Sequence, residues 1–286
     1  MLNWQAVPWA HEVMMTRPPE IPFVGHFKEG PFICLNRGTW SQLVELYTRS
    51  DGQIYCSPEM RDWFRTVMPS CFASRRPRMV MDGDLPKREW LYAPFAPRLS
   101  GSGRELHTVV PGRPIGLHPP IVREMADHGI HLHFYGESIH SQWREWIDTV
   151  NRIAPGYLHL HPAVDHRHWV TEFPRYDAGW LHFFASAKEG ELERADWDDL
   201  NIPAGIGPLV AAGLPLLQRD NTGAVVATQS LARELGTQLR NKSLVQEIRR
   251  NVLATRHLFT FDHHCDRLVH FFRAVIAGKR HGVIAS

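Results

Sequence analysis

Histidine side chains are concentrated where they could bind a metal ion or line a polar cleft. Residues 159–184 hold five histidines, and the rings of His159 and His161 fall on one face of an expected strand because side chains alternate along strands. The same spacing relates His131 and His133 in an earlier expected strand. Imidazole nitrogens suit zinc and other transition metals. A metal-dependent hydrolase is therefore one hypothesis.

The zinc hypothesis lacks a recognisable ligand pattern. The chain contains neither HExxH nor HxE followed by PCxxC. The run His263, His264 and Cys265 opens an expected helix, where successive side chains point about 100° apart and cannot converge on one ion. We expect the histidines to line a polar cleft or to be satisfied within the sheet. His161, at the end of its strand, should line the cleft, His159 should lie deeper, and neither should bind zinc.

Composition and charge indicate an ordinary globular protein. The 286 residues are 43% hydrophobic and 22% charged, and the formal net charge is +2, so a nucleic-acid partner is not expected. The cysteines are far apart and form no CxxC pair, which fits a reducing compartment. No apolar run reaches the ~20 residues of a membrane span, and the N-terminus lacks the features of a signal peptide. We expect a cytoplasmic protein without a transmembrane segment.

The pattern of strands and helices predicts an α/β protein. A helix at 39–50, a buried strand within 51–57 and a helix at 58–68 capped by Ser57 form a local α-β-α unit. After a loop-rich stretch, strands alternate with helices, which predicts a Rossmann-like parallel sheet covered on both faces. Such sheets bind ligands at the carboxyl ends of their strands. The expected strands are 106–112, 130–136, 157–162, 177–184 and 214–218; the expected helices are 118–129, 141–153, 167–175, 204–213, 224–236 and two or three within 243–277.

The loop-rich stretch, residues 70–105, is the best candidate for a domain boundary. We expect a shortened N-terminal α/β domain at 1–78, a Rossmann-like domain at 79–270, and a C-terminal helix and tail at 271–286. GxSxG, GxxxxGK[ST] and GxGxxG are all absent, so a serine-hydrolase elbow, a P-loop and a dinucleotide fingerprint are unsupported.

Five segments in order resemble the C-terminal domain of retaining (GT4-like) GT-B-fold glycosyltransferases. They are "GRPIGLHPPIVREMADHGIHLHFYG", "YLHLHPAV", "PRYDAGWLHF", "DDLNIPAGIGPLVAAGLPLL" and "HHCDRLVHFFRAVI". The resemblance covers about residue 51 to the C-terminus. It implies a GT-B-like fold and transfer of a sugar from a nucleotide-diphosphate sugar to an unknown acceptor. It implies no metal cofactor, because contacts from the protein stabilise the departing diphosphate.

The resemblance also implies the site residues. Arg113 would add charge for the diphosphate, His161 would lie where the base is read, and "QAVPWAHEVM" resembles a strand and loop with His11, the candidate catalytic base, facing the acceptor. Asp177 is expected to cap neighbouring N–H groups at a strand start. The donor-binding set is Gly112, Arg113, Tyr135, Gly136, His161, Val164, Asp199, Asn201, Ile202 and Pro203.

Two departures from the family pattern keep a second hypothesis open. Gly205 and Pro208 stand where the family has a Lys and a Glu that contact the donor, and Glu189, Asp198 and Asp199 are the nearby carboxylates that could substitute. The N-terminal domain is short, so a partner subunit could complete it. The alternative is therefore a non-catalytic GT-B-like binding or partner subunit.

Overall fold

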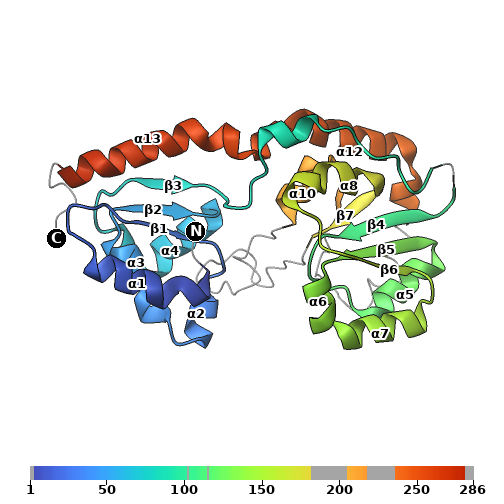
Figure 1. The fold of residues 1–286 in the computed structure, drawn as a ribbon, viewed down its shortest axis with the longest axis horizontal. Coiled ribbons are helices and arrows are strands. Elements are labelled where there is room, and N and C mark those ends of the chain that lie inside the picture. The colour runs from blue at the N-terminus through green and yellow to red at the C-terminus, as the bar shows by residue number, and fades with distance from the viewer. Residues whose placement is uncertain (1–2, 102, 115, 182–204, 218–235, 281–286) are drawn as a thin grey trace. The chain divides into compact units, whose positions relative to one another are not determined.

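The computed structural model describes residues 3–101, 103–114, 116–181, 205–217 and 236–280 (Figure 1). These residues form two compact units. Unit 1 contains the described residues up to 84 together with those from 264 onward, and unit 2 contains the described residues of 85–184 and 203–263. The boundary thus falls after residue 84 rather than after 78. The last helix returns to unit 1, because its apolar side chains pack on the sheet of that unit.

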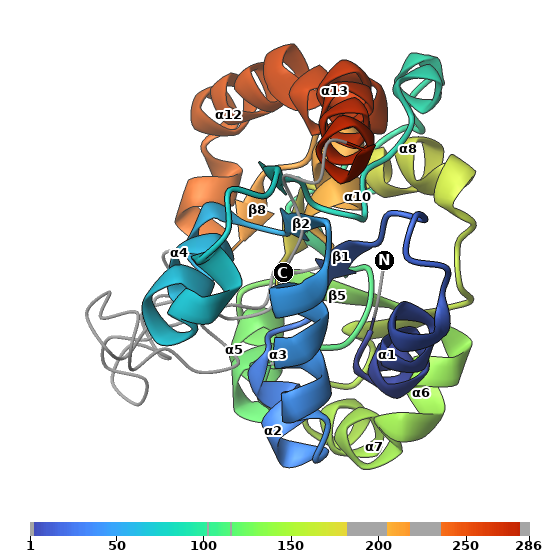
Figure 2. The same cartoon turned by 90° about the vertical axis from the view of Figure 1, so that its left-hand side faces the viewer.

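Unit 1 is built on a three-stranded parallel sheet in the order β1-β2-β3. The helices before and between these strands pack on one face, and the long helix α13 packs on the other, as Figures 1 and 2 show from two sides. The expected α-β-α unit is confirmed as α3, β2 and α4. The bounds are α1 Val7–Thr16, β1 Val24–Phe27, α2 Phe32–Asn36, α3 Trp40–Arg49, β2 Gly52–Tyr55, α4 Pro58–Val67, β3 Arg78–Val80 and α13 Phe261–Arg280.

The local sequence explains why α4 and α1 form. The Ser57 hydroxyl accepts a hydrogen bond from the Met60 amide at 3.0 Å, which caps α4 as expected. The segment around His11, expected as a strand and loop, is instead helix α1. Val7, Ala10 and Met14 recur at helical spacing and are buried in the core, so the apolar period of this segment is helical.

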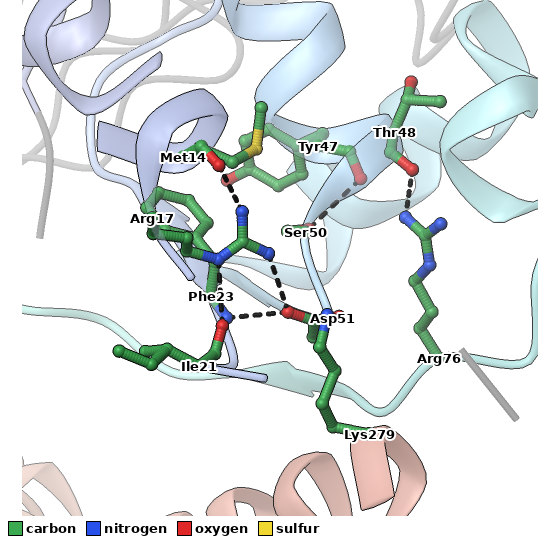
Figure 3. Close-up of polar contacts among 10 residues, drawn as sticks. All are labelled: Met14, Arg17, Ile21, Phe23, Tyr47, Thr48, Ser50, Asp51, Arg76 and Lys279. Atoms are coloured by element: carbon green, nitrogen blue, oxygen red, sulfur yellow. Dashed lines mark hydrogen bonds and ion pairs between the residues drawn. The ribbon is translucent and has the colours of Figure 1, made fainter. Parts of the chain in front are cut away.

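The buried carboxylate of Asp51 joins three parts of unit 1 (Figure 3). Its Oδ2 accepts hydrogen bonds from the Phe23 amide at 2.8 Å and from Arg17 at 3.0 Å, and its Oδ1 accepts from Lys279 Nζ at 2.9 Å. Burial alone would raise the pKa of Asp51, but the bonds from Lys279, Phe23 and Arg17 hold it below the ordinary value. This carboxylate fixes the end of α13 and the α1–β1 connection to the start of β2.

Unit 2 contains a five-stranded parallel sheet in the order β6-β5-β4-β7-β8. Figure 1 shows α5 and α7 on one face, with α8 and α10 on the other. The expected alternation of strands and helices is confirmed for the described residues, except that the helix expected at 141–153 is divided into α6 and α7. The bounds are β4 Leu106–Val110, α5 Pro119–Asp127, β5 Ile130–Tyr135, α6 Glu137–Gln142, α7 Arg144–Ile153, β6 Leu158–His161, α8 Trp169–Glu172, β7 Ala178–Trp180, α10 Ile206–Ala211, β8 Leu216–Leu217 and α12 Lys242–Thr255.

Short 3-10 helices complete the described structure at Trp4–Ala6, Pro69–Phe72, Arg88–Tyr92, His166–His168, Phe173–Arg175 and Arg256–Phe259. The helix expected at 224–236 lies almost wholly outside the described residues. Among the helices that are described, none has the length and apolar character needed to cross a bilayer.

The packing of α13 on β2 leaves no room for a side chain at Gly52. A Cβ there would lie 2.5 Å from Val275 Cγ2 and 2.9 Å from Phe271 Cζ. We expect Gly52→Ala to lower the free energy of unfolding by about 1–3 kcal/mol through overpacking. Gly25→Ala on β1 is the control, because its nearest contacts would be an ordinary 3.7 Å.

Urea unfolding of these variants and of Gly52→Ala/Val275→Ala measures the effect. Removal of the Val275 methyl groups should make the double variant more stable than the sum of the single changes. Equal stability of Gly52→Ala and Gly25→Ala would contradict the tight contact between α13 and β2.

Candidate functional site

The strand order of unit 2 brings three loops to one edge of the sheet. Strands β6, β5 and β4 are parallel neighbours, so the loops that follow them lie at the same carboxyl edge. The amide of Gly136, just after β5, donates to the carbonyl of His161, the last residue of β6, at 3.1 Å. The strand order changes direction beyond β4, which pairs with β5 on one side and β7 on the other. In sheets of this kind, ligands bind in the crevice at that point.

The turn after β4 has free space around Gly112 and an exposed cationic side chain. A Cβ built on Gly112 would meet no atom within 4 Å, and the side chain of Arg113 is exposed. Gly205, which precedes α10, lies against this turn, since its Cβ would be 3.1 Å from Pro111 Cγ. Pro208 is buried within α10. The two positions that carry a Lys and a Glu in the resembling family therefore supply no charge here.

The turn after β5 depends on a glycine. Gly136 has a φ of +119°, in the region that side chains with a Cβ rarely adopt. This backbone conformation lets α6 begin directly after β5. Gly136 is therefore needed at its position, and it brings main chain rather than a side chain to the carboxyl edge.

Five histidines form a continuous layer of rings on one face of β4, β5 and β6. One chain runs from His107 Nδ1 to His133 Nε2 at 3.0 Å, and from His133 Nδ1 to His161 Nε2 at 2.8 Å. A second bond joins His131 Nδ1 to His159 Nε2 at 2.9 Å. The rings also stack, with centroids 4.6 Å apart for His107 and His131 and 4.5 Å apart for His133 and His159. We call these five residues the histidine layer.

The surroundings of His107, His133, His159 and His161 favour the neutral form of their rings. Each nitrogen–nitrogen hydrogen bond needs one ring as donor and the other as acceptor, which two imidazolium ions cannot provide. Burial first, and then the neighbouring histidines, lower the pKa of His133 to about 2. The pKa values of His107, His159 and His161 are also lowered, mainly by burial.

The histidine layer bears on the metal hypothesis for the described residues. No group of three or more His, Cys, Asp or Glu side chains there is arranged to hold a metal ion. Six of the ten ring nitrogens in the histidine layer bond one another instead. His263 and Cys265 lie in the first turns of α13, as the expected helix there requires. The structure thus gives no support to the metal-dependent hydrolase hypothesis.

His159 and His161 differ less than expected. Both are half-buried, so the expected deeper position of His159 is not found. Both rings stack on His133, and His161 also stacks on Tyr135 with centroids 4.5 Å apart. His161 does end β6, at the carboxyl edge.

Tyr135 stacks on His161 and is itself fixed by hydrogen bonds. Its side chain is buried, and its hydroxyl donates to Glu172 Oε1 at 2.5 Å and contacts the Tyr176 hydroxyl. Glu172 in turn accepts from Arg175 at 2.9 Å. Burial, followed by the bonds to Glu172 and Tyr176, raises the pKa of Tyr135. Tyr135 is therefore placed to position His161 through stacking.

Val164 packs against the same apolar cluster as Tyr135. The sequence analysis missed Glu172 and Arg175, because nothing in the short segment between β6 and β7 indicates which side chains of the sheet it contacts.

The expected role of Asp177 is confirmed, since its Oδ2 accepts from the His107 amide at 2.9 Å and its Oδ1 accepts from Ser100 at 2.8 Å.

The remaining expected site residues divide into two groups. His11 lies on α1 of unit 1, where its Nε2 is 2.6 Å from Glu45 Oε2 on α3; its role as a catalytic base stays a prediction. The other group lies outside the described residues and comprises Asp199, Asn201, Ile202 and Pro203, together with the possible substitutes Glu189 and Asp198.

Comparison with known proteins identifies the fold of this chain but no sequence relative. No protein-family model matches the chain, and no curated protein matches it in sequence. Sucrose-phosphate synthase from Thermosynechococcus elongatus superimposes with a TM-score of 0.65 at 11% identity, over 96% of this chain and 73% of that one. An α,α-trehalose-phosphate synthase (UDP-forming) from Burkholderia vietnamiensis gives 0.56 at 13% identity, over 95% and 70%.

The GtfA/B complex gives a TM-score of 0.52 at 11% identity, over 85% of this chain and 48% of that one. Identities at this level show the fold alone. The chain therefore has the GT-B fold of these glycosyltransferases, with parallel sheets flanked by helices, and the expected fold class and resemblance are confirmed.

The lowered pKa of His133 predicts a loss of stability in acid. The folded-state pKa of His133, about 2, lies below the ~6.5 of an unfolded histidine. Between these values the unfolded chain binds more protons, so the stabilisation is complete above pH ~6.5 and is lost as the pH falls below it. For His133 alone the loss between pH 6.5 and 5 should be about 2 kcal/mol.

Urea unfolding of the parent and of His133→Gln across this pH range measures the effect, because Gln can hydrogen-bond but does not titrate. The stability of His133→Gln should depend less steeply on pH, whatever its value at pH 7. The exposed His118→Gln serves as control and should keep the parent slope. Identical slopes for all three proteins would contradict a neutral, buried His133.

Proposed function

We propose that this protein is a glycosyltransferase that binds a nucleotide-diphosphate sugar at the carboxyl edge of the sheet in unit 2. The observation that carries the proposal is the meeting of the Gly112 turn, the Gly136 turn and His161 on three adjacent parallel strands. The names of the structural neighbours support it, since one is a UDP-forming trehalose-phosphate synthase and another a sucrose-phosphate synthase.

The proposed diphosphate site is the turn after β4. Glycine turns let phosphate oxygens approach backbone amides closely, because no Cβ stands in the way. The space around Gly112 is open, and the exposed guanidinium of Arg113 can form a charge-assisted bond with a phosphate. These groups would stabilise the diphosphate as it leaves, so the proposed reaction needs no metal ion. Asn201, outside the described residues, remains a proposed donor contact.

The proposed contact to the nucleoside is His161. Its Nε2 is bonded to His133, and within the described residues its Nδ1 has no hydrogen-bond partner. The chain His107–His133–His161 has one direction, because each ring donates through one nitrogen and accepts through the other. That direction fixes whether Nδ1 of His161 donates or accepts. The histidine layer can thus set the polarity of the group that meets the nucleoside.

A non-catalytic donor-binding subunit is the second candidate, and one observation favours it. Gly205 and the buried Pro208 provide no charge beside the turn after β4. The GtfA/B neighbour is described as a complex, so a subunit completed by a partner is a coherent form of this proposal. Turnover assays with UDP-, GDP- and ADP-sugars separate the candidates, since the subunit would bind a donor without hydrolysing or transferring it.

The metal-independent site predicts nucleotide binding in the presence of a chelator. Calorimetric titration with UDP, GDP and ADP in EDTA should give saturable binding of at least one nucleotide. Adding Mg²⁺ or Mn²⁺ should leave its affinity unchanged, because the protein supplies the charge that neutralises the diphosphate. Binding that requires the metal would reject the metal-independent form of the proposal.

The proposed role of Arg113 predicts a selective loss of affinity. Arg113→Ala should weaken binding of the nucleotide found above by about 10- to 100-fold, which corresponds to the roughly 1.5–3 kcal/mol of a hydrogen bond to a charged group. Arg152→Ala on α7, also exposed, is the matched control. Both variants should melt like the parent. Unchanged affinity in Arg113→Ala would remove this side chain from the site.

A further inference from the structure

The amino edge of the same sheet carries a second cavity. Its volume is about 460 Å³, within the range of small-molecule sites. Its lining includes Leu106 at the start of β4, Asp177 just before β7, and residues in the first turns of α12. The amino and carboxyl ends of parallel strands lie at opposite edges of a sheet, so this cavity is separate from the proposed donor site.

Positive charge dominates the lining. Arg98, Arg104, Arg240 and Lys242 all line the cavity, and Asp177 is the one acidic side chain among its lining residues. The Asp177 carboxylate is already occupied by the His107 amide and the Ser100 hydroxyl. Its distance to Arg98 is 3.9 Å, which is too long for a hydrogen bond. The cavity therefore holds more positive charge than its own carboxylate can balance.

Two of these cations are available to a ligand. Arg240 is committed in part, because its Nη2 donates to the carbonyl of His128 at 2.5 Å. Arg104 and Lys242 are exposed, and neither has an ion-pair partner in the part of the chain that the structure describes. Side chains of this kind can close on an anion without breaking an existing contact.

Arg249, further along α12, does not line the cavity but interacts electrostatically with Arg98 and Asp177, which do. Its Nη1 is buried and has no hydrogen-bond partner among the described residues. Burial first, and then the charge of Arg98, lower the pKa of Arg249 to about 10. Both effects disfavour a guanidinium at this place. A bound anion would offset the repulsion between Arg249 and Arg98.

Backbone groups beside the cavity also favour a bound anion. Helix α12 has 14 residues, and the side chain of Asn241 caps it by accepting from the Leu244 amide at 3.2 Å. Lys242, the first residue of this helix, lines the cavity, so the partial positive charge of the helix start lies beside it. Gly101 and Gly103 line the opposite side, and Gly101 has a φ of +45°. A glycine at each of these positions leaves the loop backbone accessible.

We propose that this cavity is a second anion site, which binds a small molecule bearing phosphate groups with at least two negative charges. Four cationic side chains, a helix start and an occupied carboxylate favour a polyanion over a neutral sugar or a cation. The site does not depend on the proposed function, because it shares no residue with the carboxyl edge. A ligand here and a nucleotide at the carboxyl edge can be bound at the same time.

Calorimetry with inorganic pyrophosphate at constant ionic strength tests this site. The Arg113→Ala variant is the starting protein, so that binding at the proposed donor site is weakened first. Pyrophosphate should still bind in a saturable manner, and adding Arg104→Ala and Lys242→Ala should weaken it at least tenfold. The control adds Arg123→Ala and Arg152→Ala, which remove two exposed cations elsewhere in unit 2, and should leave binding unchanged.

Three outcomes would overturn the proposal. They are no saturable binding of pyrophosphate to the parent protein, equal losses in the two charge-reduced variants, and loss of all binding through Arg113→Ala alone. The last result would place pyrophosphate at the carboxyl edge and support the proposed function while rejecting the second site. Circular dichroism confirms that each variant is folded.

Discussion

The parallel pairing of β4 with β5 on one side and β7 on the other is the constraint on which unit 2 depends. Parallel strands must be joined by crossovers, so helices are forced onto both faces and every strand ends at the same edge. The turns at Pro111 and Gly136 and the end of β6 at His161 are brought together by this rule alone. The same rule separates that edge from the cationic cavity at the other.

The histidine layer shows how a polar face can be buried in such a sheet. Burying an imidazole without a hydrogen-bond partner is costly, and here each of the five rings forms at least one hydrogen bond to another ring. Protonation of both rings in a bonded pair would break the hydrogen bond between them. The layer also connects His107, whose amide is held by Asp177, to His161 at the carboxyl edge. This chain of hydrogen-bonded rings therefore helps to position His161, the proposed nucleoside contact.

The sequence predicted most elements of unit 2, because apolar residues recur along its short strands, its longer helices are amphipathic, and Gly and Pro separate them. The prediction of a strand and loop at α1, which came from the family resemblance, was wrong. The helical spacing of Val7, Ala10 and Met14 indicates the helix that forms there. The resemblance placed Gly136 and His161 in one donor-binding set; the structure joins their backbones by a hydrogen bond, and their role in donor binding stays a prediction. The sequence could not pair the histidines with one another, or Tyr135 with Glu172, because such contacts depend on strand register and on a short helix distant in sequence.

Hydrogen–deuterium exchange with and without a nucleotide diphosphate tests the central claim most directly, because it shows where the ligand lies without assuming which residue binds it. The account predicts slower exchange in the amides that follow β4, β5 and β6, namely around Gly112, Gly136 and Val164, when UDP, GDP or ADP is present at saturation. Protection confined to unit 1 or to the amino edge around Gly101 and Lys242, or no protection with any of the three nucleotides, would contradict it.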